Sequence, residues 1–251
     1  MTIRGSGVWV GGLVLAAALW SAPAARAQRT GDGFLFGPPR GSFGVRAGFA
    51  LPDASSDIYS FLTDELTLTK ASFDAFSLAG DLSVRVASRL DIVLSAGWSG
   101  SNAPSEMRHW LGPNDVPIAQ TTSLQRVPLT ASLKWYVTPP GRSVGRFAWV
   151  PARYALFVGA GGGAMYYRLH QSGDFVNFAD TTIFSDAFDA SGWTATAHVF
   201  AGVDVALGPS LVLSGEARYA LAKGSLGADF SGFDRIDLSG FSLTAGVALR
   251  F

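Results

Sequence analysis

The sequence predicts an all-β fold, an eight-stranded antiparallel up-and-down β-barrel that spans a membrane. Apolar residues alternate with small or polar residues in eight segments, which is the pattern of strands with two different faces. The composition, with 30 glycines and only 15% charged residues, favours strands and turns over amphipathic helices. An export signal precedes all eight segments.

The N-terminus has the parts of a secretory signal peptide. Arg4 provides a positive charge, an apolar stretch runs from Val8 to Trp20, and Ala25 and Ala27 are the small residues before a cleavage point. An uncleaved anchor helix is the alternative, but the stretch is shorter than the ~20 residues that a spanning helix needs. The predicted organisation is a signal peptide over residues 1–27, a periplasmic lead-in over 28–41 and a barrel domain over 42–251.

The first three predicted strands alternate clearly. Every second residue is apolar from Phe43 to Phe49, from Phe76 to Val86 except at Gly80, and from Leu90 to Trp98. The residues between them are mostly small, polar or charged, as the inner face of a barrel requires. A one-residue slip would turn the inner charges toward lipid, so the register is strongly specified.

The fourth and fifth predicted strands are less regular. Alternation runs from Val127 to Val137, but Pro128 cannot donate to the ladder, and we expect a β-bulge there. Between Tyr154 and Leu169, a run of glycines blurs the two faces. We assign Leu156, Val158, Ala160 and Tyr166 to the outer face.

The last three predicted strands restore the pattern. Apolar or small residues occupy every second position from Trp193 to Leu207, from Leu211 to Leu221 and from Phe241 to Phe251. The total of eight is even, as bacterial barrels require. Aromatic residues gather at the strand ends, which predicts girdles at both membrane interfaces. The alternative is that aromatic residues simply favour strands.

The connections alternate in length. The first, third, fifth and seventh are long, and we expect them outside the cell, because barrels of this type have short periplasmic turns. The sixth and second are tight turns, and the fourth, Thr138 to Arg153, is longer than a periplasmic turn should be. The four long connections are Ala50–Ala75, Gly100–Thr122, His170–Gly192 and Ala222–Gly240.

Ten charged residues fall on the predicted inner face. An eight-stranded barrel leaves an interior just wide enough for side chains. We therefore expect a packed polar network that pairs these charges, and the alternative is a gated conduit or proton-sensitive plug. The predicted network consists of Arg46, Asp81, Arg85, Asp91, Arg126, Lys134, Asp204, Glu216, Arg218 and Arg250.

Catalytic and metal-binding motifs are weak. His170 and Ser172 lie two residues apart, and with Asp174 or Asp186 they could form a nucleophile–base set, but no flanking motif supports it. His198 is expected as a core residue on the inner face. The absence of cysteine excludes disulfides and thiolate ligands, and no metal-ligand spacing occurs. No cofactor is expected.

The external connections contain apolar side chains. They predict contact with a partner or host surface, or extension of the strands above the membrane with a hydrophobic ligand mouth. The alternative is packing of the loops on one another over the barrel top. The formal net charge of zero argues against nucleic acid as a partner. The residues are Ile58, Tyr59, Phe61 and Leu62 in the first loop, and Phe175, Phe178, Phe184 and Phe188 in the third.

Several segments together resemble one known family. They are GSFGVRAGFALP (Gly41–Pro52), RVPLTASLKWYVTP (Arg126–Pro139), YALFVGAGGGAMYYRL (Tyr154–Leu169), SGEARYAL (Ser214–Leu221) and LSGFSLTAGVALRF (Leu238–Phe251). With the signal peptide, they resemble the small bacterial outer-membrane β-barrel proteins, which include the OmpA-type barrel domain and the OmpX and OmpW groups. The terminal Phe251 resembles the signature that this family's assembly machinery reads.

The resemblance implies an outer-membrane protein that contacts membrane lipid, lipopolysaccharide and the assembly machinery. We expect a non-enzymatic protein that supports envelope integrity and makes surface contacts through its external loops. The alternative is an OmpW-like narrow conduit for small hydrophobic molecules, with a pocket under the first and third loops and a side opening in the wall. A lipid A-modifying enzyme is the least favoured function, and a water-soluble barrel would need polar outer faces.

Overall fold

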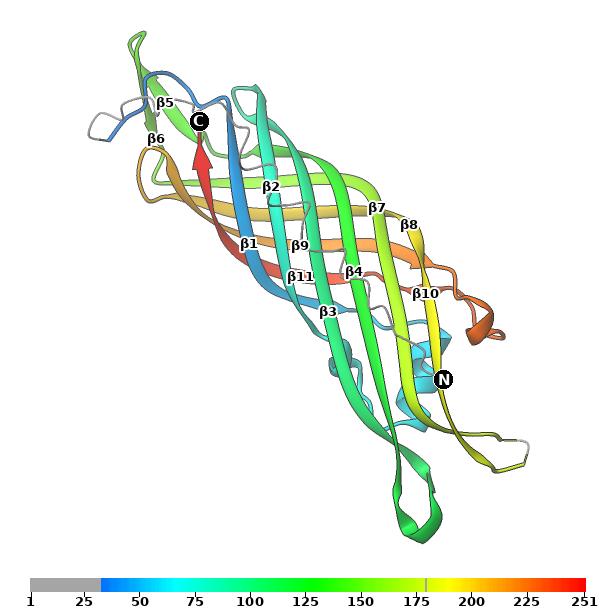
Figure 1. Cartoon of the computed structure of the whole chain (residues 1–251). Helices are drawn as coiled ribbons and strands as arrows, with labels where there is room; N and C mark the ends of the chain where they lie inside the picture. Colours follow the sequence, from blue (N-terminus) through cyan, green and yellow to red (C-terminus); the bar gives the residue numbers. More distant parts are fainter. Residues whose placement is uncertain (1–32, 179) are drawn as a thin grey trace, which may run out of the picture.

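Eight antiparallel strands form a closed ring in the computed structural model, which describes residues 33–178 and 180–251 (Figure 1). The predicted eight-stranded antiparallel barrel is therefore confirmed. The predicted signal peptide, residues 1–27, lies outside the described residues. In ring order the strands are β1 (Gly41–Pro52), β2 (Ala75–Ala87), β3 (Leu90–Leu111), β4 (Pro117–Tyr136), β7 (Tyr154–Val176), β8 (Ile183–Ala206), β9 (Leu211–Gly224) and β11 (Gly240–Arg250).

The ring closes between the first and last strands. β1 pairs with β11 from Ser42↔Arg250 to Pro52↔Gly240, and its other edge pairs with β2. The two faces of the fifth strand of the ring, β7, are now settled. Leu156, Val158 and Ala160 are exposed on the outer face as predicted, while Ala155 and Phe157 are buried inside.

Glycines on the inner face of β7 make room for a large ring from the next strand. A Cβ on Gly159 would lie 2.2 Å from the ring of Phe200 and 2.4 Å from the backbone oxygen of Leu133. The glycine run that blurs the sequence pattern therefore lets Phe200 of β8 fill the lumen, where it contacts Phe157 with ring centroids 6.2 Å apart.

The predicted bulge at Pro128 is wrong. β3 and β4 pair Ala96↔Leu129 and then Ser99↔Arg126, so no residue is inserted. On its other side, Pro128 is in register with Met165 of β7. Gly97 offers the space that the pyrrolidine ring needs, since a Cβ on Gly97 would lie 3.1 Å from Pro128 Cγ.

Two of the predicted long loops are largely strand. β3 and β4 continue as a hairpin to a short η2 turn (Pro113–Asp115), and β7 and β8 pair as far as Val176↔Ile183. These hairpins extend from the end of the barrel opposite to β5 and β6 (Figure 1). Inter-strand pairing therefore continues beyond the ring into these two long connections.

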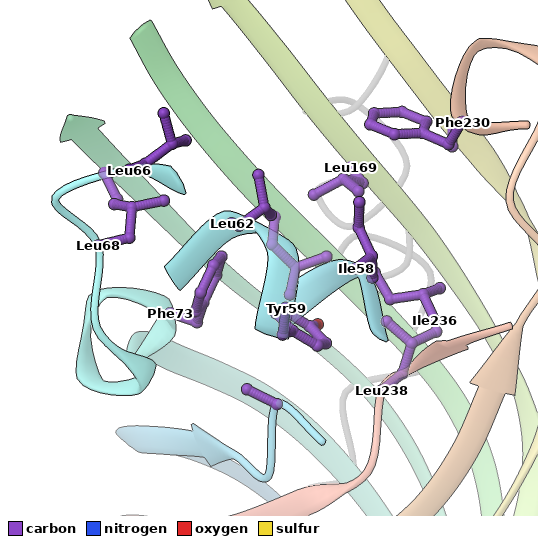
Figure 2. Packing of buried hydrophobic residues seen from close by; sticks show 14 of the residues in the cluster. Ile58, Tyr59, Leu62, Leu66, Leu68, Phe73, Leu169, Phe230, Ile236 and Leu238 are labelled. Atoms are coloured by element: carbon purple, nitrogen blue, oxygen red, sulfur yellow. The ribbon is translucent and has the colours of Figure 1, made fainter. Parts of the chain in front are cut away.

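The other two long connections fold over the barrel mouth. The first contains α2 (Asp57–Glu65) and η1 (Lys70–Phe73), and the last contains η3 (Ala228–Phe230) and β10 (Ile236–Asp237), which pairs with the end of β9. Figure 2 shows Ile58 and Tyr59 of α2 beside Ile236 and Leu238. This cluster is the main hydrophobic core, and it includes Leu62, Leu66, Leu68, Phe73, Leu124, Tyr167, Leu169 and Phe230.

The long turn from Thr138 to Arg153 forms a hairpin of its own. β5 (Gly141–Val144) and β6 (Ala148–Pro151) pair as a separate two-stranded sheet near the C-terminus of the chain (Figure 1). Trp149 of β6 exchanges two backbone hydrogen bonds with Leu35, at 2.8 and 2.9 Å. Both side chains are buried, so the segment around Leu35 and this hairpin hold each other at the periplasmic end of the barrel.

Candidate functional site

Charged side chains from three strands, and a serine from a fourth, meet in the lumen. Arg46 of β1 donates from Nε to Asp81 Oδ2 at 2.5 Å and from Nη1 to Glu216 Oε1 at 2.6 Å. Arg218 Nε also donates to Glu216 Oε1, at 2.9 Å, and the Ser95 hydroxyl donates to Asp81. This arginine–carboxylate cluster crosses the lumen from β2 and β3 to β9. It therefore joins strands that are not neighbours in the ring.

Two further clusters hold the remaining carboxylates of the predicted network. Asp91 accepts from Arg85 Nε at 2.8 Å and from the Ser83 hydroxyl at 3.1 Å. Asp204 accepts from Lys134 Nζ at 2.8 Å, from the Tyr136 hydroxyl at 2.9 Å and from the Ser214 hydroxyl at 2.7 Å. Eight of the ten predicted network residues thus form ion pairs.

Arg126 and Arg250 take part in none of these ion pairs. Arg126 is buried near the mouth, where Nη1 donates to the Leu238 carbonyl at 3.4 Å, and Nη2 has no hydrogen-bond partner in the described chain. The Tyr59 hydroxyl is also buried without a partner there, and burial raises the pKa of this phenol. Arg250 lies at the opposite end, with its guanidinium 5.6 Å from the ring centre of Trp149.

Aromatic rings complete the lumen. Lys134 Nζ lies 3.7 Å from the ring centre of Phe157 and 4.9 Å from that of Tyr136, and Arg218 lies over Phe200 at 5.1 Å. Phe157 and Phe200 were not among the predicted site residues. Both occupy inner-face positions of their strands. The alternation of side chains along a strand is therefore the signal that could have identified them.

The nucleophile–base set that the sequence only weakly suggested does not assemble. His170 Nδ1 lies 3.1 Å from Asp189, while Asp174 accepts from Ser185 and Asp186 accepts from the backbone of Ala187. A different pair occurs in the lumen, where His198 Nε2 lies 2.8 Å from the Ser132 hydroxyl. Both residues of that pair are buried, and His198 lies beside Phe200 as a core residue.

The described part of the chain contains no group of three or more histidine, aspartate or glutamate residues that could hold a metal ion. It also contains no helix long and apolar enough to cross a membrane.

An apolar pocket of about 190 Å³ opens beside α2 in the barrel mouth. Ile58 and Phe61 of the first loop line one side, and the amides of Gln120 and Gln171, which share a 2.6 Å hydrogen bond, also line it. Ile58, Tyr59 and Leu62 are buried, so here the loops pack on one another. The remaining aromatic lining consists of Phe175, Phe178, Phe184, Phe188, Phe230 and Phe233.

The outer wall of the ring is apolar. Large hydrophobic side chains are exposed on every ring strand, as the surface of a transmembrane barrel requires and a water-soluble barrel does not allow. The protein therefore has the architecture of an outer-membrane β-barrel. The belt includes Val45, Phe49, Leu82, Val84, Leu94, Leu133, Leu156, Val158, Val199, Leu213, Leu243 and Val247.

No protein-family profile and no curated protein sequence matches the chain. Among solved structures, Neisserial surface protein A (NspA) is 15% identical, with a TM-score of 0.45 over 84% of this chain and 96% of that protein. OprG from Pseudomonas aeruginosa is 17% identical, with a TM-score of 0.43 over 86% and 98%. Ail of Yersinia pestis is 12% identical, with a TM-score of 0.42 over 86% and 100%. All three similarities are distant.

Proposed function

We propose that this chain is a non-enzymatic outer-membrane protein with a sealed lumen, which supports envelope integrity and makes surface contacts through its external loops. The observation that carries the proposal is the arginine–carboxylate cluster across the lumen. Arg46 reaches Asp81 on one side and Glu216 on the other, so paired charges occupy the middle of the barrel. The hydrophobic core around α2 covers the external mouth above them.

The external hairpins supply the contact surface in this proposal. Their tips meet where the rings of Trp110 and Phe178 lie 6.2 Å apart. Leu111, Val116 and Phe178 are more than half exposed beside this contact, beyond the membrane belt. Exposed apolar residues at such a position fit a protein or lipid surface better than water.

Single-channel conductance of the refolded chain in a planar bilayer tests the sealed lumen. We expect no steady openings, whereas a porin inserted in the same bilayer gives its usual steps. Reproducible openings would reject the sealed lumen and favour a conduit. The non-enzymatic part has its own test, which is mass spectrometry of lipid A from cells with and without the chain. A new lipid A species would reject it.

The hairpin tips are tested in whole cells. A variant with Leu111 and Phe178 both replaced by serine should lower adhesion of expressing cells to an apolar surface, at equal surface expression. A variant with Glu106→Gln, an exposed polar position of β3, is the matched control. Equal adhesion of the double variant and the wild-type chain would remove the tips from the proposal.

A second candidate function is the OmpW-like conduit for small hydrophobic molecules, and the pocket beside α2 favours it. Seven phenylalanine side chains give that pocket the chemistry of a site for a small apolar or aromatic molecule. The ion pairs beneath it disfavour passage, because an apolar molecule would have to cross charged groups. Uptake of a radiolabelled aromatic compound into cells with and without the chain distinguishes passage from no passage.

A further inference from the structure

Nine charged side chains line one cavity of about 60 Å³ in the periplasmic half of the lumen, and their charges do not cancel. The cations are Arg46, Arg85, Lys134, Arg218 and Arg250. The anions are the four carboxylates of the three clusters described above. Five cations against four carboxylates leave one positive charge in this cavity.

The surplus charge belongs to Arg250. Every carboxylate in the cavity already accepts from another cation, at 2.5 to 2.9 Å, and Arg250 forms no ion pair in the described chain. Its side chain is 8% exposed, and the buried Nη1 has no hydrogen-bond partner. Buried charges in proteins are normally paired, because an unpaired one keeps its full desolvation cost.

The ring of Trp149 satisfies Arg250 only in part. A contact of 5.6 Å to the ring centre is a cation–π interaction, which offers no acceptor for the N–H groups. Within the described residues, the terminal carboxylate of Phe251, the next residue, forms no ion pair with Arg250 either, and its backbone oxygen already accepts from the N–H groups of Arg40 and Gly41 at 2.7 and 3.1 Å.

The cavity borders an open vestibule on the periplasmic side. Arg85 and Arg250 line both this cavity and the open vestibule of about 1410 Å³ beneath it, which Leu35 and Trp149 border. A cavity of this size exceeds what one water molecule requires. An ion that enters this vestibule therefore meets the Arg250 side chain without crossing the apolar core of the external mouth.

We propose that the periplasmic half of the lumen binds one small monovalent anion, such as chloride, at Arg250. One negative charge neutralises the surplus and gives Nη1 an acceptor. A doubly charged oxyanion would reverse the imbalance and meet the carboxylates of Asp91 and Asp204 in the same cavity. The anion supplies the one negative charge that the four carboxylates do not provide.

Bromide provides a direct test. Crystals of the full barrel grown in sodium bromide should show an anomalous peak beside Arg250 in the wild-type chain and none in Arg250→Gln. The solution test replaces chloride by gluconate, which is too large for the cavity, at constant ionic strength. The apparent melting temperature in detergent should rise by several degrees with chloride and saturate, because a ligand that binds only the folded state stabilises it.

Two variants separate this site from general salt effects. Arg250→Gln should lose the chloride dependence, while Arg142→Gln, an exposed position of β5, should keep it. Heat-modifiable migration on unboiled gels checks that Arg250→Gln folds. If it does not fold, the bromide experiment is repeated with Arg250→Lys, which keeps the positive charge and should show the same peak as the wild-type chain. No lumen peak, or equal chloride dependence in wild type and Arg250→Gln, would overturn the proposal. A peak without chloride-dependent stability would mean an adventitious ion only.

Discussion

Arg46 Nη1 and Glu216 Oε1 lie 2.6 Å apart across the lumen, joining β1 to β9, which is not its neighbour in the ring. Both side chains are 8% exposed. This ion pair therefore braces the wall from inside, in addition to the backbone ladders. Because Glu216 also accepts from Arg218, one carboxylate pairs with two cations, the buried Arg46 and the 15% exposed Arg218.

Replacing Glu216 by alanine should destabilise the barrel strongly. The change leaves Arg218 without an ion-pair partner and Arg46 with Asp81 alone. Breaking a buried ion pair costs about 3–5 kcal/mol. Urea unfolding in lipid vesicles, followed by tryptophan fluorescence, measures the loss.

The exposed ion pair between Arg168 and Asp189 provides the control for that experiment. Its side chains are 52% and 34% exposed, so Asp189→Ala should cost less than about 1 kcal/mol. Similar losses for Glu216→Ala and Asp189→Ala would contradict a special role for the lumen cluster. Unchanged stability of Glu216→Ala would contradict the network altogether.

Gly159→Ala should destabilise the barrel, although alanine is usually a harmless replacement. The new Cβ would lie 2.2 Å from the Phe200 ring and 2.4 Å from the Leu133 oxygen. Overpacking of this kind costs about 1–3 kcal/mol. Gly80→Ala is the matched control, because nothing lies within 4 Å of a Cβ at that outward position. The same unfolding assay compares them, and equal stability of both variants would show that Phe200 moves aside freely.

Acid should loosen the connections that fold over the external mouth, which contain α2 and β10, by protonating Asp237. Burial alone would raise the pKa of this carboxyl, but hydrogen bonds from the Ser55 and Ser239 side chains and the Ser239 backbone outweigh it, and the pKa is lowered. A depressed pKa in the folded state stabilises the fold above the unfolded value of about 3.9. That contribution is lost as the pH falls through the lower folded value.

Hydrogen exchange of the backbone in α2 and β10 checks this effect. Protection there should fall below about pH 4, while β1 and β11 should stay protected. In Asp237→Asn, which lacks the titrating group, protection should be lower at neutral pH and change less with acid. Equal pH dependence in Asp237→Asn and wild type would assign the loosening to another group.

The sequence predicted the wall better than its two ends, for a physical reason. Within the membrane, lipid demands apolar residues at every second position, and this demand is readable residue by residue, as from Phe241 to Phe251. Beyond the membrane that demand ends. The hairpin continuing from Gly100 to Leu111 therefore alternates too weakly to be recognised, and its ladder was predicted as loop.

The connections over the external mouth and the charges in the lumen show the same limit of prediction from sequence. Ile58, Tyr59 and Leu62 have helical spacing, but the nine-residue helix is stable only through burial against Ile236 and Leu238, which are far along the chain. The alternation of inward and outward side chains along each strand predicted ten charges inside the barrel. Which of them pair depends on the stagger between strands, so the isolation of Arg126 and Arg250 required the structure.

The long turn from Thr138 to Arg153 gives the last prediction. Trp149 is only 4% exposed, exchanges backbone hydrogen bonds with Leu35 and lies against Arg250. Trp149→Ala should remove about 3–5 kcal/mol of packing at the periplasmic end. Limited proteolysis from the periplasmic side should then cut the segment from residue 33 to 40 faster.

Phe147, at the tip of the same hairpin, provides the comparison. It is 76% exposed, so Phe147→Ala removes a ring of similar size without removing a buried contact. Its cleavage rate should match that of the wild-type chain. If Trp149→Ala and Phe147→Ala were cut equally slowly, the hairpin would not anchor the lead-in. If both were cut faster, the tip and not Trp149 would protect this segment, for instance by blocking access of the protease.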